Sequence, residues 1–250
     1  MRHSHIGVRS NLITYNLSPR KVTTFLLSII SILIFFNLVE RGIVYWLNAQ
    51  NNSQLISIYF NFDREGNFPS MYSALILGFC SYLLTVIAAF KRSTKARYSK
   101  YWKALSYIFL FLAIDEACSI HELLIPILRT AFNTEGLLYF PWVIPAFFLV
   151  IIFLIVFRKF ILSLPINTKA LFICAGTVYV TGALGMELIG GYIADNYGYN
   201  TIYGIASTIE ELLEMLGVVI FVYGLLSYIQ TQTSELNFSL SFKQAKKTIF

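Results

Sequence analysis

The sequence predicts an all-α integral membrane protein, built as a bundle of six transmembrane helices with both termini in the cytoplasm. Its composition is the first reason: 57% of the 250 residues are hydrophobic and only 13% are charged, whereas a soluble domain carries about 25% charged residues. The second is a series of continuous apolar stretches, and the third is a one-sided distribution of Lys and Arg. A water-soluble globule and a disordered chain are both excluded.

Six apolar stretches are long enough to cross a bilayer, which requires about 17–25 predominantly apolar residues in a helix. None shows the alternation typical of a β-barrel strand. The third is interrupted by acidic residues. In chain order the stretches are Val22–Val39 with a continuation toward Leu47, Ser70–Phe90, Ala104–Leu128, Trp142–Phe157, Ala170–Ala194 and Gly204–Ile229. They define a transmembrane domain over residues 22–229, between cytoplasmic tails at 1–21 and 230–250.

The basic residues predict the orientation, because cytoplasmic loops of membrane proteins carry an excess of Lys and Arg. With six spans, all of the 19 Lys and Arg residues except Arg41, Arg64 and Arg129 fall on one side. The formal net charge of +6 is then explained by loops that face anionic headgroups. No nucleic-acid motif accompanies the charge. The predicted partner is therefore the lipid bilayer and not a nucleic acid, and the oligomeric state is left open.

Seven of the 13 acidic residues lie inside these apolar segments. A carboxylate at the bilayer centre costs roughly 2.5–3.5 kcal/mol, so each must face another polar group, a cation or water. At a rise of about 1.5 Å per residue, all lie in the middle or outer half of the membrane. We expect one site that opens toward the exterior or the outer leaflet. The seven are Asp115, Glu116, Glu122, Glu187, Glu210, Glu211 and Glu214.

Helix geometry predicts which of these residues face inward. In a continuous third helix, Asp115, Ser119 and Glu122 share one face. Glu116 lies about 100° from that face, and His121 about 120° from it on the other side. Asp115 and Glu122 are therefore the predicted inward pair, with His121 reaching the bundle from the flank.

Small residues accompany the acids of the last two segments and favour close helix packing. We expect them to place Glu187 and the stripe of Glu210 and Glu214 in helix interfaces. The small residues are Gly176, Ala183 and Gly191 beside Glu187, and Gly217 and Gly224 beside Glu214.

A second interpretation of the acids remains open. The third segment would end near Asp115, and residues 115–129 would form an interfacial amphipathic helix with solvated acids. Glu210 and Glu211 would then occupy the first turns of the sixth helix, where the helix dipole favours anions. This interpretation does not account for Glu187 or Glu214.

Crowded carboxylates in a low dielectric cannot all stay ionised unless a cation neutralises them. Oxygen ligands with one imidazole suit Mn²⁺, Fe²⁺, Mg²⁺ or Ca²⁺, and so many acids could bridge two metals. The ferritin-like di-iron pattern and a zinc site both need further His or Cys ligands. We predict divalent-metal ligands at Asp115, His121, Glu122, Glu187, Glu210, Glu211 and Glu214, and catalytic roles for His121, Asp115 and Glu116.

The first outer loop, Asn61–Asn67, has the alternating oxygen ligands and the Gly of the first half of a calcium loop. Its twelfth position is Tyr72, where an EF-hand has a bidentate Glu. A plain turn before a helix start at Pro69 is the favoured interpretation. Calcium binding by this loop is left open.

Three motifs together resemble a set of uncharacterised bacterial multi-pass membrane proteins. They are FDREGNFP at Phe62–Pro69, DEACSIHE at Asp115–Glu122 and EELLEMLG at Glu210–Gly217. The resemblance covers most of residues 20–230, and the set has no established activity. It implies the fold, a place in the bacterial inner (plasma) membrane, and that the three motifs act as one unit.

Three functions are compatible with these residues. The first is chemistry on a membrane-embedded or outer-leaflet substrate, such as a lipid or a lipid-soluble compound, with a divalent metal held by the acids. Without a metal, one carboxyl group could act as a general acid. The second is a cation- or proton-coupled transporter that uses the same acids as its transit site. The third is a non-catalytic membrane scaffold in which the acids serve as hydrogen-bonding groups between helices.

Overall fold

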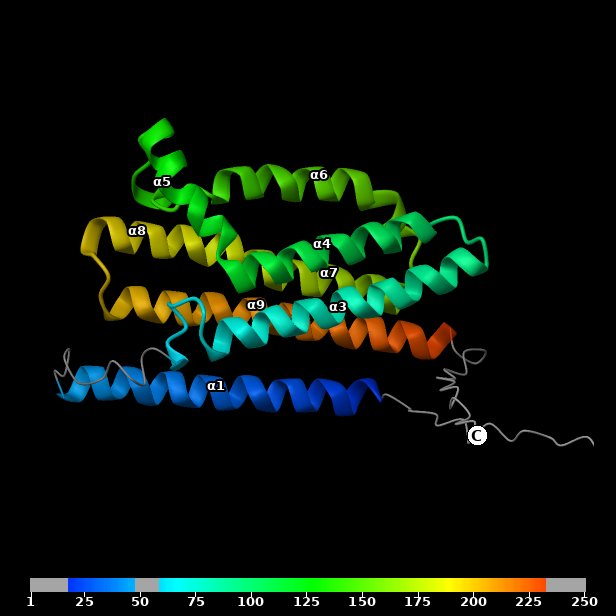
Figure 1. The fold of residues 1–250 in the computed structure, drawn as a ribbon, viewed down its shortest axis with the longest axis horizontal. Helices are drawn as coiled ribbons and strands as arrows, with labels where there is room; N and C mark the ends of the chain where they lie inside the picture. Colours follow the sequence, from blue (N-terminus) through cyan, green and yellow to red (C-terminus); the bar gives the residue numbers. More distant parts are fainter. Residues whose placement is uncertain (1–17, 48–58, 233–250) are drawn as a thin grey trace, which may run out of the picture.

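A computed structural model describes residues 18–47 and 59–232 of the chain. These residues form helices that run back and forth side by side, with no strand among them (Figure 1). The elements are α1 (Pro19–Leu47), α3 (Phe68–Ser93), α4 (Ser99–Cys118), α5 (Ile120–Phe132), a 3₁₀ turn (Gly136–Leu138), α6 (Val143–Leu162), α7 (Ile166–Val180), a π-helical turn (Thr181–Met186), α8 (Glu187–Tyr197) and α9 (Thr201–Gln232).

Within the described chain, five helical segments are long and apolar enough to cross a membrane, as expected for a multi-pass membrane protein. These are α1 over Pro19–Ile43, α3, α6, the unbroken unit from α7 to α8, and α9. The remaining predicted span corresponds to α4, which packs along α3 (Figure 1). The predicted tails, 1–21 and 230–250, lie mostly outside the described residues.

Helix α9 occupies the centre of the bundle and packs against α1, α3, α7 and α8. Its half nearer the C-terminus belongs to an aromatic core. The Trp102 ring stacks on Tyr228 at a centroid distance of 4.9 Å and meets Phe160 edge-on at 5.0 Å. Phe160 is fully buried. Rings of this size contribute most of the contact area where helices meet.

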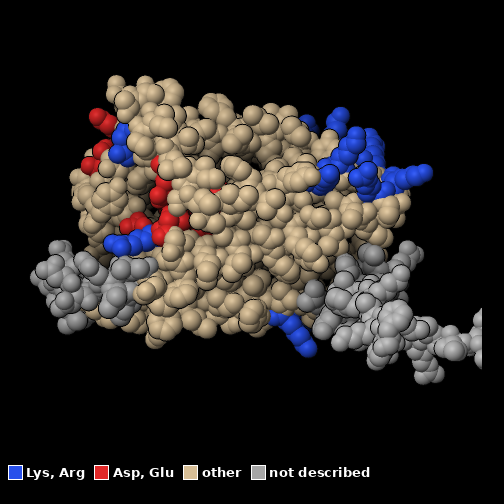
Figure 2. Space-filling view, viewed as in Figure 1, with Lys and Arg blue, Asp and Glu red and all other residues tan. Residues whose placement is uncertain are grey.

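The two ends of the bundle differ in charge. Lys91 and Arg92 lie in the last turn of α3, and Lys159 in the last turn of α6. Both helices finish at the same end of the bundle (Figure 1). Figure 2 shows Lys and Arg gathered at that end, which we call the basic end, and Asp and Glu toward the opposite one, which we call the acidic end.

The third predicted span is not one continuous helix. Helix α4 ends at Cys118, and Ser119 adopts a left-handed conformation with φ of 51° and ψ of 43°. Helix α5 then leaves in a different direction (Figure 1). A single left-handed residue is enough to end a helix, because the next amide cannot continue the ladder. The boundary near Asp115 in the second interpretation is therefore close to the one observed.

Candidate metal centre

Acidic side chains from one loop and two helices meet at the acidic end. Glu65 comes from the loop before α3, Glu116 from the last turn of α4, and Glu211 from α9. One carboxylate oxygen from each lies within 4.8 Å of the other two. Oxygen atoms on opposite sides of a bound ion are separated by two bond lengths, which is about 4.6–5.2 Å for Ca²⁺ and about 4.0–4.2 Å for Mg²⁺. The spacing therefore suits a hard divalent cation.

A closed loop positions Glu65. The Asn67 side chain caps α3 by accepting from the Ser70 amide at 3.1 Å, and its Nδ2 donates to the carbonyls of Asn61 at 2.6 Å and Arg64 at 2.7 Å. The favoured prediction of a turn before Pro69 is confirmed. Gly66 follows Glu65 with a φ of +71°, a backbone conformation that residues with a side chain rarely adopt. The backbone therefore turns sharply directly after Glu65.

The Glu65 carboxyl is strongly influenced by its surroundings. Burial raises its pKa from 4.5 to about 7, the positive charge of His121 opposes that rise, and Glu122 and Asp115 add to it. The Ser119 hydroxyl also hydrogen-bonds this carboxyl. Its Oε2 atom is buried and has no partner within the described chain. The sequence analysis singled out the loop that contains Glu65 but did not predict that Glu65 joins the intramembrane acids.

Glu116 is the most buried acid of the group, with 8% of its surface exposed. Its Oε1 atom has no hydrogen-bond partner among the described residues. The prediction that Glu116 lies off the inward face is wrong. Because the helix ends at Cys118, the face shared by Asp115 and Glu122 in a continuous helix does not exist. Glu122 is on α5 and is exposed.

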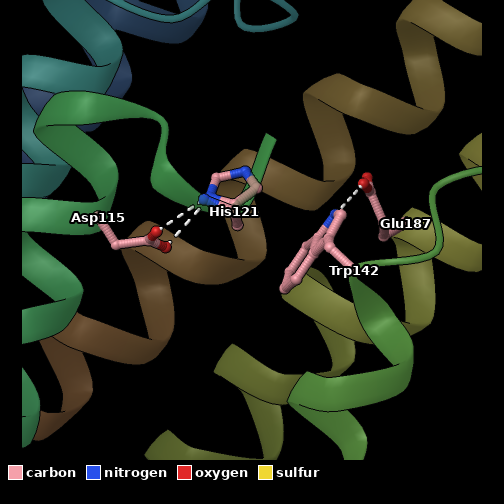
Figure 3. A network of polar contacts seen from close by, with 4 residues as sticks. All are labelled: Asp115, His121, Trp142 and Glu187. Carbon is pink, nitrogen blue, oxygen red and sulfur yellow. Dashed lines mark hydrogen bonds and ion pairs between the residues drawn. The ribbon is translucent and has the colours of Figure 1, made fainter. Parts of the chain in front are cut away.

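Asp115 binds the start of α5. Its Oδ1 accepts from the His121 backbone amide at 2.9 Å, and its Oδ2 lies 3.0 Å from His121 Nδ1 (Figure 3). The carboxylate thereby satisfies an amide in the first turn of a helix and orients the imidazole. A ring nitrogen of His121 also forms a second group with Glu65 and Glu122, again with ligand atoms within 4.8 Å. Glu65 belongs to both groups.

The exposed surface of α5 fits an interfacial helix. Leu123, Ile127 and Phe132 are each more than 60% exposed. An amphipathic helix of this kind lies in the membrane interface with its apolar side chains in lipid. The structure confirms one part of the second interpretation, a break near Asp115 followed by a separate helix. Asp115 is hydrogen-bonded to His121 and is not simply solvated, whereas Glu122 is exposed.

Glu187 and Glu210 form a separate polar contact beside these groups. Trp142 Nε1 donates to Glu187 Oε1 at 2.6 Å (Figure 3), and the Glu187 and Glu210 carboxyls hydrogen-bond each other. A hydrogen bond between two carboxyls requires a proton on one of them. The Trp142 ring also contacts the His121 ring, with centroids 4.7 Å apart. Trp142 therefore connects the Asp115–His121 pair to the Glu187–Glu210 pair.

The π-helical turn before Glu187 brings α7 and α9 together. A Cβ atom on Gly182 would lie 2.8 Å from the Glu210 carbonyl oxygen and 3.0 Å from Glu214 Cγ. Glu214 itself is hydrogen-bonded to Tyr179. Turns of this type recur at functional sites. Of the small residues predicted beside Glu187, Gly176 has no neighbour within 4 Å of an added Cβ, whereas an added Cβ on Gly191 would lie 3.4 Å from Phe140.

The stripe on α9 is placed as expected. An added Cβ on Gly217 would lie 2.8 Å from the Tyr179 amide nitrogen, and one on Gly224 would lie 3.3 Å from Leu171 Cβ. These two glycines therefore let α9 approach α7 closely, which keeps Glu211 and Glu214 in the helix interface.

A partly buried cation, Arg41, lies beside the acids. Arg41 Nε donates to Asn37 at 3.3 Å and to Thr208 at 3.1 Å, and the guanidinium rests where Gly204 has no side chain. Its charge also acts on Asp63, where burial raises the pKa and a Tyr203 hydrogen bond and Arg41 oppose the rise. Arg41 thus holds the loop that carries Glu65 against α1 and α9.

An apolar cavity of about 120 Å³ lies on the side of these groups nearer the basic end. Helices α4, α6, α7 and α9 surround it, and its lining includes Phe109, Phe157, Gly176, Tyr179 and Phe221. Tyr179 connects the cavity to the acids, because its hydroxyl is bonded to Glu214.

A family model described as a domain of unknown function, DUF8692, matches residues 24–229. No curated protein and no solved structure matches the chain. The matched region contains both acidic groups, the π-helical turn and the apolar cavity.

Proposed function

The chain belongs to the DUF8692 family, and we propose that it binds a divalent metal ion between Glu65, Glu116 and Glu211 and uses it for chemistry on a membrane-embedded or outer-leaflet substrate. The observation that carries this proposal is the buried Oε1 atom of Glu116, which has no hydrogen-bond partner in the described part of the chain and belongs to a carboxylate grouped with two others. A buried carboxylate oxygen without a partner is costly, and a coordinated cation removes that cost.

The donor set determines the class of metal. Carboxylate oxygens suit Mg²⁺, Ca²⁺ and Mn²⁺, and the imidazole of His121 nearby extends the choice to Fe²⁺. A bound ion of this kind supplies Lewis-acid activation of an oxygen-bearing group. Asp115 would orient the imidazole of His121, and this pair would move a proton. The Glu187–Glu210 pair would hold a proton between its two carboxyls. Glu214 completes the acidic layer through Tyr179.

The membrane arrangement follows from the charged ends. We place α4 across the membrane beside α3, which gives six spans and puts both termini on the side of the basic end. By the positive-inside rule that side is the cytoplasm. The metal centre then lies near the outer face of a bacterial inner membrane, and α5 lies in the outer interface.

The apolar cavity supports a lipid-soluble substrate. Its lining is almost entirely apolar, and at membrane depth the surrounding medium consists of alkyl chains. We place the alkyl chain of a lipid in this cavity, with its polar group toward Tyr179 and the acids. A cavity of this kind binds apolar ligands through contact and exclusion of water.

Thermal stability tests the metal site. Purified full-length protein is treated with chelator and then titrated with Mn²⁺, and we expect the melting temperature to rise, since an ion at about 100-fold its Kd stabilises the fold by about 2.7 kcal/mol. Glu116→Gln removes the buried charge, so it should keep or raise the metal-free melting temperature and show a smaller rise with Mn²⁺. Glu135→Gln, an exposed acid outside both groups, serves as control. An unchanged Mn²⁺ response in Glu116→Gln would contradict the proposal.

Photocrosslinking tests the lipid site. A lipid carrying a photoreactive group in its alkyl chain should label α7 or α9 near the cavity. Gly176→Phe would fill the cavity, because an added Cβ meets nothing within 4 Å there. Ile155→Phe on the exposed face of α6, 71% exposed, is the matched control. Equal labelling of the two variants would show that the alkyl chain of the lipid does not occupy this cavity.

A further inference from the structure

Glu65 lies in both groups of ligand atoms. One group contains Glu65, Glu116 and Glu211, and the other contains Glu65, His121 and Glu122, each with its ligand atoms within 4.8 Å. A carboxylate has two oxygens and can bind two cations at once. The loop that carries Glu65 is fixed at its base by the Asn67 hydrogen bonds, so its carboxylate is held between the two groups.

The group that contains His121 shows a further feature of metal sites, a histidine ring held by a carboxylate. Asp115 occupies His121 Nδ1 and the His121 backbone amide, which leaves Nε2 as the free ring nitrogen (Figure 3). Metal-binding histidines commonly donate their other nitrogen to a carboxylate, because this fixes the ring and raises its basicity. The Trp142 ring against the imidazole further limits its rotation.

Charge balance favours two ions over one. The two groups together contain four carboxylates, from Glu65, Glu116, Glu122 and Glu211. A single divalent cation would leave an excess of two negative charges, whereas two divalent cations would neutralise all four. Two residues of these groups also have a buried oxygen without a hydrogen-bond partner among the described residues, Glu65 at Oε2 and Glu116 at Oε1.

We propose that the centre is dinuclear, with the Glu65 carboxylate bridging two divalent cations. The first ion is held by Glu116 and Glu211 in the buried group. The second is held by His121 and Glu122, and is more accessible because Glu122 is exposed. This inference rests on the proposed function, since the first ion is the one proposed there. It adds a second ion, a bridge and a separate role for His121.

Metal stoichiometry of the purified full-length protein tests the inference. After chelation, Mn²⁺ reloading and removal of free ion, elemental analysis should find two Mn²⁺ per chain. Glu116→Gln and His121→Gln should each retain one ion, and Glu65→Gln should retain neither tightly. Glu135→Gln should retain two.

The outcomes separate the two proposals. One ion per chain that is lost in Glu116→Gln and unaffected by His121→Gln would leave the proposed function intact and overturn the dinuclear centre. No bound ion in the unmodified protein would overturn both. Electron paramagnetic resonance of the unmodified protein is a check that needs no variant. A spin-coupled pair gives a multiline spectrum, and the six-line spectrum of isolated Mn²⁺ at full loading would contradict the bridge.

Discussion

The acidic end and the aromatic core near the basic end use opposite strategies within the same bundle. In the core, Trp102, Phe160 and Tyr228 fill the space between helices with rings. At the acidic end, Glu65 and Glu116 each have a buried oxygen that no residue in 18–47 or 59–232 hydrogen-bonds. Side-chain packing stabilises a fold without a ligand, whereas unpartnered buried carboxylates reduce stability until a cation binds. We therefore assign stability mainly to the aromatic core and propose that the function resides at the acidic end.

The largest expected effect is in the aromatic core. Phe160→Ala removes a fully buried ring that contacts Tyr101 and Trp102, and it should reduce the free energy of unfolding by about 3–5 kcal/mol. Ile155→Ala on the same helix, at an exposed position, should change it by less than about 0.5 kcal/mol. Unfolding in detergent measures both. The Mn²⁺-induced stabilisation should persist in Phe160→Ala, and its disappearance would show that the two regions are not separate.

A smaller effect is expected where the two regions join. Gly182→Ala would place a Cβ 2.8 Å from the Glu210 carbonyl oxygen, so the π-helical turn must move away from α9 at a cost of about 1–3 kcal/mol. Gly176→Ala in α7 has free space around its Cβ and should be close to neutral. Thermal unfolding compares the two variants. Equal melting temperatures would mean that the close approach of α7 and α9 contributes nothing to the site.

A further effect is a pH dependence of the metal-free protein. Burial raises the pKa of Glu65 from 4.5 to about 7, so the fold favours its protonated form. Its stability contribution is fully present below about 4.5 and is lost as the pH rises through about 7. With chelator present, the melting temperature relative to Glu65→Gln should therefore fall between these pH values. If the melting temperatures of the two proteins change in parallel with pH, the Glu65 carboxyl is not buried in this way.

The sequence was sufficient for five of the six predicted apolar spans, for the basic end and for the gathering of acids at one end. Hydropathy and charge act on whole segments and do not depend on the exact orientation of one residue. It was not sufficient for the faces of individual acids. Ser119 ends α4 in a left-handed conformation, and neither Gly nor Pro marks that position. The break reverses the expected roles of Glu116 and Glu122.

Glu65 was missed for a different reason. Its contacts with Glu116 and Glu211 join a loop to two helices distant in the sequence, and only the packed bundle brings them together. The sequence feature that could have identified Glu65 is its acidic side chain, in a loop next to the predicted intramembrane acids. The π-helical turn at 181–186 likewise depends on packing against α9, which local sequence does not encode.

The most direct test of the metal centre is a structure of the full-length protein with Mn²⁺, with the ion located by anomalous scattering. We expect a peak coordinated by Glu65, Glu116 and Glu211. A structure at saturating Mn²⁺ without such a peak, and with these three carboxylates bonded to water or to one another, would contradict it.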